Sequence, residues 1–419
     1  MDSNFSHGKP PNILDHDLNR HFVELLKFES TQEMEASDLW KEIRVEAQRV
    51  LDAVVAEELA SEHVRDESRR MNSIKALAWN IERGIVFDGI LDALQNHTDL
   101  RDKDLLMLTE LDYGMARSGN RFVAQEIAKA LNLNYAFAPV YIALQKGSGV
   151  ESEMEGENTK SIHGLAMFSK WPMRNVHAIP LPNGKDKMWG KEKRLGSLRA
   201  LFADVEHPLG TSRAVTVHLD AHCSRAHRQM QMRLILDHLD ALPKLPTLIG
   251  GDWNTTTFNS QSSTRAIMGY WRRVLMGPKN VAENHLPHPE RFFEKPLFEM
   301  LERRGYSFRD LNNIGQGTLH YHVESIEKNT NLRDWVPEWC FPFIFWAANR
   351  VGGSVSGRLD WFAGQGLEPA AGSEPKTIGD LVDSEGTPLS DHDAITIDIV
   401  PTGYVRAGGH SAEQTLSYP

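Results

Sequence analysis

Acidic and amide side chains recur in this sequence directly after short apolar runs. Hard cations such as Mg²⁺ prefer oxygen ligands from one or two carboxylates and keep waters for the rest of their shell. If the apolar runs are strands of neighbouring sheets, their polar ends meet at one rim, where carboxylates that would otherwise repel one another can share a cation. The candidates are Asn80 and Glu82 in AWNIERG, Glu110 in LLMLTELD, Asp252 and Asn254 in GGDWNT, Asp360 in RLDW, and Asp391 in LSDHD.

Two histidines stand in similar positions, His218 in VTVHLD and His392 in LSDHD. A single histidine after a strand is more often structural than catalytic, but both of these lie beside acids in strand-end motifs. Hydrolysis of a phosphate ester needs charge neutralisation on the phosphate, an aligned water and stabilisation of the leaving oxygen. Acids, amides and histidines at one rim can meet these three needs.

The elements that must position these side chains begin near Ser73, where apolar runs alternate with helical patterns. Strands interleaved with helices predict an α/β layered domain. The expected helices cover residues 121–133 and 224–242. The expected strands cover residues 74–81, 104–111, 163–169, 198–206, 214–220, 247–254, 358–364 and 394–400.

Two segments fall outside this rhythm. Residues 36–70 have the apolar spacing of one long amphipathic helix, with Ser37 as its cap, after an arm and a short helix in residues 1–35. Residues 259–350 form a long insertion that either buries its aromatic side chains as a subdomain or lines a substrate cleft. These aromatic residues are Tyr270, Trp271, Phe292, Phe293, Trp335, Trp339, Phe341, Phe343 and Trp346.

Composition narrows the classes of protein. The chain has 419 residues, 41% hydrophobic and 25% charged, as in a folded soluble protein. It shows neither a secretory signal nor a membrane-length apolar stretch, so we expect a cytoplasmic location. A net charge of -11 argues against a broad nucleic-acid footprint, although the basic run from Lys185 to Arg199 could form a local groove. Cys223 and Cys340 are too few for a disulfide framework.

The motifs and their order resemble the endonuclease/exonuclease/phosphatase superfamily, which has the DNase-I-like fold. One such motif would be a weak signal, but all of them in the family's order over residues 73 to about 400 are a strong one. The resemblance implies a four-layer α/β/β/α sandwich with an N-terminal helical extension. The matching motifs are WNIERG, the Glu110 strand, HGLAMFSKWPM, VHLDAH, GGDWN, RLDW and SDHD.

The resemblance also implies a role for each matching position. Glu110 corresponds to the principal ligand of a Mg²⁺ or Mn²⁺ ion, with Asn80, Glu82 and Asp391 near the metal and its waters. Asp252 resembles the residue that orients or deprotonates the attacking water. Asn254 resembles the amide that helps to hold the phosphate and that water.

The histidines receive roles in the same way. His392, paired with Asp360, resembles the histidine next to the scissile phosphate, and the sequence leaves open whether it acts as a base or as an electrostatic stabiliser. His218 resembles the second phosphate-binding histidine. Tyr141 matches a tyrosine that some members place near the phosphate. Arg194 and Arg199 are further candidates for the cleft, whereas His163 is expected to be structural.

The resulting hypothesis is a metal-dependent phosphoesterase that cleaves a phosphodiester or phosphomonoester by direct attack of water. The substrate could be nucleic acid, a nucleotide, or a lipid or inositol phosphate. A DNA or RNA nuclease is one alternative, and a non-catalytic binding or scaffold protein of the same fold is another. We expect an extension in residues 1–70, a catalytic domain in 71–402 and a tail in 403–419. The oligomeric state stays open, because the N-terminal helix could be a dimer arm or a cover for a sheet edge.

Overall fold

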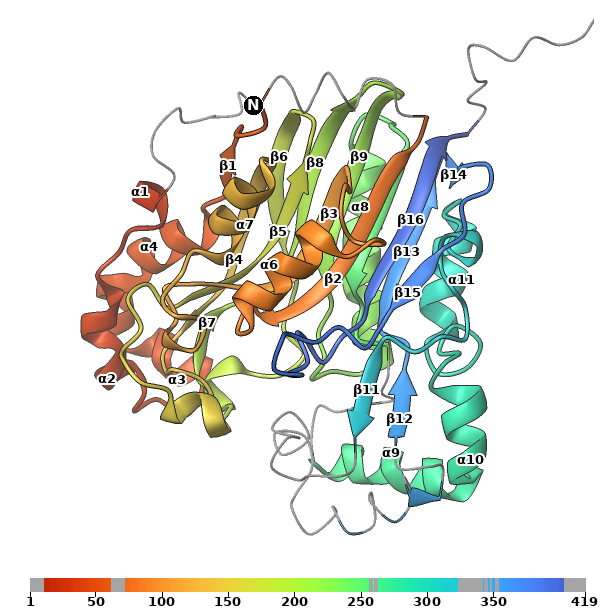
Figure 1. The fold of residues 1–419 in the computed structure, drawn as a ribbon. Coiled ribbons are helices and arrows are strands. Elements are labelled where there is room, and N and C mark those ends of the chain that lie inside the picture. Colours follow the sequence, from red (N-terminus) through yellow and green to blue (C-terminus); the bar gives the residue numbers. More distant parts are fainter. Residues whose placement is uncertain are drawn as a thin grey trace, which may run out of the picture.

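Two β-sheets lie face to face at the centre of the molecule, with helices on both outer sides (Figure 1). The computed structural model describes residues 11–61, 72–255, 259, 263–322, 342, 346, 349–350 and 354–402. The expected four-layer α/β/β/α arrangement is therefore confirmed. No helix in these ranges is long and apolar enough to cross a membrane.

Within the described ranges, the first sheet has nine strands and the second has five. The order in the first sheet is β1 (Val55–Glu57), β4 (Asn134–Ala143), β5 (Ile162–Ser169), β3 (Leu105–Tyr113), β2 (Ile74–Arg83), β16 (Ala394–Pro401) and β14 (Leu367–Pro369), with β7 (Arg194–Gly196) beside β4 and β15 (Lys376–Ile378) beside β16. The order in the second sheet is β13 (Asp360–Gln365), β10 (Thr247–Asp252), β9 (Gly210–His218), β8 (Arg199–His207) and β6 (Met173–Pro180). A separate pair joins β11 (Leu319–His322) to β12 (Ser354–Gly357).

Helices cover the outer face of each sheet. On the first sheet these are α4 (Asp38–Asp52), α6 (Phe87–Asn96) and α7 (Val123–Leu131), and on the second sheet α8 (Arg225–Ala241) and α11 (Lys295–Arg303). The remaining helices are α1 (Pro11–Leu14), α2 (Phe22–Leu25), α3 (Thr31–Ala36), α9 (Ser263–Met276) and α10 (Pro278–Asn280). The short turns are η1 (Leu18–His21), η2 (Ala116–Ser118), η3 (Gly149–Glu153), η4 (Lys187–Trp189), η5 (Val281–His285) and η6 (Arg309–Leu311).

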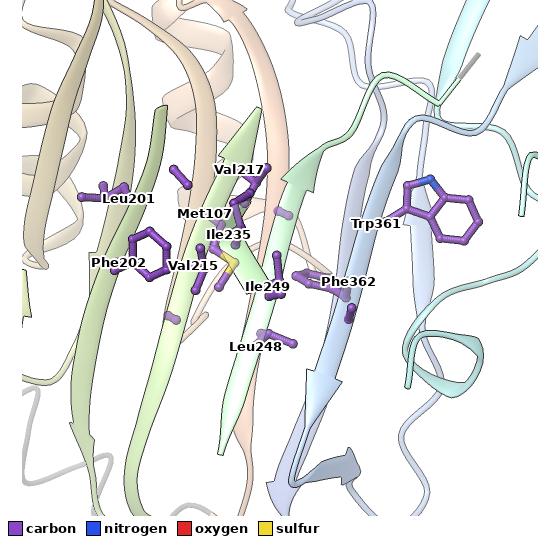
Figure 2. Close-up of a cluster of buried hydrophobic side chains, with 14 of the residues drawn as sticks. Met107, Leu201, Phe202, Val215, Val217, Ile235, Leu248, Ile249, Trp361 and Phe362 are labelled. Atoms are coloured by element: carbon purple, nitrogen blue, oxygen red, sulfur yellow. The ribbon is translucent and has the colours of Figure 1, made fainter. Parts of the chain in front are cut away.

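The alternation of side chains along a strand decides what each face buries. On β2, Ala76 and Ala78 face the second sheet, whereas Leu77 and Trp79 face the outer helices. Small residues let the two sheets approach closely, because a Cβ atom at Gly250 would lie 2.4 Å from the sulfur of Met107. Figure 2 shows Met107 within the core that this approach creates.

The second sheet buries its outer face against α11. Trp361 and Phe362 leave β13 on opposite sides (Figure 2). Trp361 meets Phe298 of α11 with ring centroids 4.6 Å apart, and Phe298 lies 4.7 Å from Phe308. Residues 295–308 of the segment expected to be an insertion are therefore part of the sandwich. By contrast, α9, α10 and the β11–β12 pair lie below the sheets in Figure 1.

Some expectations were wrong or lie outside the described residues. The helix expected over residues 36–70 ends at Asp52, because the chain turns extended at Ala53 and Val55 pairs with Phe137 on β4. The pairing of β1 with β4 gives hydrogen-bond partners to backbone groups at the edge of the sheet, and a longer helix could not provide them. All eight expected strands and both expected helices are present, whereas β4 and β6 were not predicted. Trp335, Trp339, Phe341, Phe343 and residues 403–419 lie outside the described residues.

The contact between α11 and β13 predicts a large loss of stability for Phe298→Ala. Removing a buried phenylalanine ring costs about 3–5 kcal/mol, and Phe298 is 1% exposed. Leu275→Ala on α9 is the control, because that side chain is 87% exposed and such changes shift stability by about 0.5 kcal/mol or less. Urea unfolding of both variants measures the difference. Equal stability of the two variants would contradict the assignment of α11 to the sandwich.

Candidate active site

The predicted polar residues meet where strands of the two sheets end. In the second sheet, Asp252 on β10 is directly opposite His218 on β9 and Asp360 on β13. Side chains at directly opposite positions of neighbouring strands lie about 4.5–5.5 Å apart at Cβ. The first sheet contributes Asn80 from β2 and Glu110 from β3 to the same cleft. Two sheets thus bring together residues that are far apart in the sequence.

Asp252 is the most densely contacted carboxylate of the cleft. Its Oδ1 accepts a hydrogen bond from the backbone N–H of Asn254 at 2.8 Å. Its Oδ2 accepts from the side-chain amides of Asn80 and Asn254, both at 3.2 Å. Nε2 of His218 lies 3.5 Å from this oxygen, and Nε2 of His392 lies 3.8 Å from it. Burial raises the pKa of the Asp252 carboxyl, and the charge of His392 opposes that rise only in part.

Asn80 connects the two sheets with one amide group. Its Nδ2 donates to Oε1 of Glu110 at 3.1 Å and to Oδ2 of Asp252 at 3.2 Å. Its Oδ1 accepts a hydrogen bond from the backbone N–H of Glu82 at 3.1 Å. The side chain is 1% exposed, so little water competes for these bonds. Asn80 therefore fixes the distance between the two groups of acids.

Backbone irregularity turns Glu110 toward the cleft. Leu106, Leu108 and Leu111 all pack with the outer helices, so the alternation along β3 shifts by one residue at Glu110. The pairing of β3 with β5 shifts register between Leu108 and Leu111. Glu110 has a φ of 58°, in the left-handed region that few residues other than glycine adopt. Such conformations cluster at functional sites, where the surrounding structure holds them.

Two further carboxylates, Glu82 and Asp391, adjoin Glu110. Oε2 of Glu82 accepts a hydrogen bond from the backbone N–H of Asp391 at 3.2 Å. Burial and the negative charge of Asp391 raise the pKa of Glu82 to about 8, and burial also raises the pKa of Asp391. Burial raises the pKa of Glu110 as well, but Arg83, His218 and His163 together lower it more, so it lies well below its usual range. Partly buried carboxylates that repel one another fit a hard divalent cation.

His392 and Asp360 form a buried pair on the other side of Asp252. Nδ1 of His392 lies 2.8 Å from Oδ2 of Asp360, and the backbone N–H of Asp360 donates to Oγ1 of Thr318 at 3.1 Å. Burial lowers the pKa of His392, but the carboxylates of Asp360 and Asp252 together raise it well above its usual value. An imidazole with its Nδ1 bonded to a carboxylate has its tautomer and orientation fixed.

The same three residues could in principle hold an ion themselves. Ligand atoms of Asp252, Asp360 and His392 all lie within 4.8 Å of one another. We infer that they form a hydrogen-bonded group instead, because a protonated imidazole between two carboxylates pairs with both and cannot also ligate a metal. The oxygen-rich group of Asn80, Glu82, Glu110 and Asp391 fits Mg²⁺ or Mn²⁺ better.

The structure also decides which other predicted residues reach the cleft. Tyr141 and Arg194 line it together with the residues above. Arg199 does not line it, because its guanidinium reaches back to Asp52 of α4 at 2.7 Å. Asn254 and Asp252 share both a backbone and a side-chain hydrogen bond, so they act as one unit.

Among the residues to which sequence reasoning assigned no individual role in the cleft, His163 and Lys187 also line it. His163 was expected to be structural, yet its ring lies at the cleft with Nδ1 2.8 Å from Oδ1 of Asp112. Arg117 donates to both oxygens of Asp112 at 2.7 and 3.1 Å. Burial raises the pKa of Asp112, but Arg117 and His163 together lower it to about 2. Only the pairing of β3 with β5 brings Asp112 and His163 together, and no local sequence signal indicates that pairing.

Comparisons with known proteins agree with this architecture. The model of a family described as "Endonuclease/Exonuclease/phosphatase family" matches residues 77–392. A similar solved structure is an endonuclease/exonuclease/phosphatase from Beutenbergia cavernae, with 15% identity, a TM-score of 0.46, and coverage of 79% of this chain and 72% of that one. No curated protein matches the sequence.

Two further solved structures are similar over most of their own length. Sphingomyelinase C from Streptomyces griseocarneus has 15% identity and a TM-score of 0.41, and the match covers 78% of this chain and 99% of that one. A 3'-5' exonuclease from Neisseria meningitidis has 13% identity and a TM-score of 0.41, with the same coverage of 78% and 99%.

The raised pKa of Glu82 predicts that metal binding strengthens with pH. A metal ligand must be deprotonated, so below pH about 8 a proton on Glu82 competes with the ion, at about 1.4 kcal/mol per pH unit. The rise in melting temperature on adding Mn²⁺ should therefore be larger at pH 8.5 than at pH 6.5. Glu82→Gln should show a smaller rise that depends less on pH.

The metal-free protein should respond in the opposite sense. Between pH 4.5 and about 8 the folded state keeps a proton on Glu82 that the unfolded chain loses. Stability in EDTA should therefore fall as pH rises through this window, relative to Glu82→Gln. Parallel melting curves of the two proteins across the window, with and without Mn²⁺, would contradict the assignment.

Proposed function

Because the chain belongs to the endonuclease/exonuclease/phosphatase family, we propose that it is a divalent-metal-dependent phosphoesterase in which water attacks the phosphorus directly. The observation that carries this proposal is the position of Asp252. Its Oδ2 lies within 3.2 to 3.8 Å of nitrogen atoms of Asn80, Asn254, His218 and His392. A carboxylate so surrounded has a fixed orientation and little freedom to turn away from the cleft.

The oxygen-rich group would hold the cation, with Glu110 as the principal ligand and Asn80, Glu82 and Asp391 near it. A bound Mg²⁺ or Mn²⁺ supplies positive charge to the phosphate oxygens and to the departing oxygen. Support for this comes from burial and the negative charge of Asp391, which together raise the pKa of Glu82 to about 8. Arg83 lies 3.9 Å from Glu110 and adds a fixed positive charge next to the site.

Asp252 has the environment of a general base. A base works best when its pKa lies near the working pH, and burial raises the pKa of this carboxyl. Hydrogen bonds from Asn80 and from both donors of Asn254 hold it in place. We assign to Asp252 the orientation of the attacking water and the acceptance of its proton.

His392 and His218 would contact the phosphate. Asp360 holds Nδ1 of His392 at 2.8 Å and keeps the ring positively charged, which leaves Nε2–H as a donor toward the cleft. Hydrogen-bond donors fixed before the reaction stabilise charge as it develops in the transition state. His218 on β9 lies opposite Asp252 on β10 and offers a second hydrogen-bond donor or acceptor to the phosphate. Asp360 acts through His392 and is therefore a positioning residue.

The lining of the cleft supports direct attack by water. Among the described residues that line it, none is a serine, threonine or cysteine, and Asp252 and His392 are held by hydrogen bonds that orient them as base and donor. The enclosed volume is about 160 Å³, whereas pockets that engulf a whole ligand typically measure about 300–1,000 Å³. We infer that the cleft holds the reacting phosphate and its immediate neighbours, while the rest of the substrate lies outside.

A DNA or RNA nuclease is the second candidate. The cations of Lys187 and Arg194 in the same cleft favour a polyanionic substrate. A non-catalytic scaffold protein of the same fold is less well supported, because a scaffold would not need three partly buried carboxylates in mutual repulsion.

A direct test is the hydrolysis of bis-p-nitrophenyl phosphate and p-nitrophenyl phosphate with Mg²⁺, Mn²⁺ or EDTA. We expect turnover that requires metal, with Asp252→Asn lower by roughly 10²–10⁴-fold, the usual contribution of a general base. Glu110→Gln should need much more metal for any remaining activity. Glu385→Gln is the matched control, because this carboxylate is exposed and does not line the cleft. No turnover in any metal condition, or full activity of Asp252→Asn, would overturn the proposal.

A further inference from the structure

One wall of the cleft carries two cations stacked on a tyrosine. The Arg194 guanidinium lies 5.4 Å from the ring centre of Tyr141, and the Lys187 ammonium lies 5.5 Å from it. All three side chains line the cleft that contains Asp252 and Glu110. The ring of His163 stacks near Tyr141 at 6.5 Å. This wall, formed by Tyr141, Lys187 and Arg194, is called the cationic wall below.

Acidic partners orient both cations without using all their donors. Lys187 lies 3.6 Å from Oδ1 of Asp220, while Asp220 also accepts hydrogen bonds from the backbone N–H groups of Gly184 and His222 at 2.6 and 2.8 Å. Arg194 pairs with Glu192. A lysine has three N–H donors and an arginine has five, so each keeps donors for a ligand. The two side chains are 14% and 26% exposed, which leaves them partly accessible.

The segment that carries these cations is held by the N-terminal extension. Asp186, which caps η4 beside Lys187, accepts a hydrogen bond at 2.8 Å from the backbone N–H of Thr31 and another at 2.5 Å from its hydroxyl. Nζ of Lys193 donates to the carbonyl oxygens of Leu26 and Phe28 at 2.8 and 2.7 Å. A surface loop would not need such attachments, so the cationic wall is a built part of the cleft.

We propose that the cationic wall is a binding subsite for a second phosphate group, covalently close to the phosphate that is hydrolysed. This inference rests on the proposed function and narrows its substrate class. Because Asp252 and the cationic wall line one small cleft, the two phosphates should lie close together in the substrate. Nucleotides with a neighbouring phosphate and inositol polyphosphates meet this condition. A phosphocholine lipid does not, because its headgroup places a cation next to the scissile phosphate.

The first test compares two esters that differ by one phosphate. The p-nitrophenyl ester of thymidine 5'-phosphate and the same ester with a 3'-phosphate release the same chromophore. We expect the 3'-phosphate to raise kcat/KM at least tenfold. Lys187→Gln and Arg194→Gln should each lower this ratio toward one, whereas Lys185→Gln should preserve it. Lys185 is the matched control, because it stacks on Trp189 and does not line the cleft.

Further substrates distinguish the classes of molecule that could supply the second phosphate. Phosphate release from inositol 1,4-bisphosphate, compared with inositol 1-phosphate, tests the inositol class, and p-nitrophenylphosphorylcholine tests the zwitterionic class. A preference for the nucleotide pair or for the inositol pair supports the subsite and names its source. Equal kcat/KM with and without the second phosphate in both pairs, or a preference for the choline ester, would overturn it.

Lys193→Met tests the role of the N-terminal extension. The Lys193 ammonium group contacts the extension and does not line the cleft. Its loss should therefore lower the ratio of kcat/KM values with and without the second phosphate only by letting the cationic wall move. A thermal melt of each variant shows that it is folded. An unchanged ratio in folded Lys193→Met would overturn the positioning by the extension. Absence of turnover on every ester would instead overturn the proposed function itself.

Discussion

The site depends on one buried amide that bonds to a carboxylate from each sheet. Asn80 reaches Glu110 of the first sheet and Asp252 of the second sheet through the same nitrogen atom, at 3.1 and 3.2 Å. Those distances leave little tolerance in how far apart the sheets lie at this rim. The alanines of β2 and the close contact of Gly250 with Met107 provide that spacing in the core below. The packing of the core between the sheets therefore also sets the distance between the acids of the site.

The electrostatics of the cleft follow from placing many charges out of water. A buried carboxylate is costly unless it is paired or hydrogen-bonded. Asp252 and Asp360 have His392 between them, and Asp112 has Arg117. Burial and the negative charge of Asp391 raise the pKa of Glu82 to about 8, and Arg83 opposes this rise only in part. The acids of the cleft thus form two groups. One group is suited to bind a metal, and the carboxylates of the other group pair with a histidine.

The sequence predicted the residues whose signal is local. Asp252 and His218 follow apolar runs directly, and the family resemblance gave them roles that no observation has yet tested. Residues whose position depends on tertiary contacts were harder to predict. Arg199 belongs to the same basic run as Arg194, but it pairs with Asp52, which lies 147 residues earlier in the sequence. Lys187 and His163 reach the cleft only because a loop and a neighbouring strand bring them there. The helix expected to continue to residue 70 ends at Asp52, because pairing with β4 overrides its helical pattern.

We propose that the acids of the cleft form two groups, one that holds the metal and one that serves the attacking water and the phosphate. The most direct measurement is a crystal structure with Mn²⁺, in which the anomalous signal locates the ion. The account predicts a peak beside Glu110, Glu82 and Asp391, with His392 still hydrogen-bonded to Asp360. A peak among Asp252, Asp360 and His392 would contradict it, because the proposed base and the phosphate-binding histidine would then both be metal ligands.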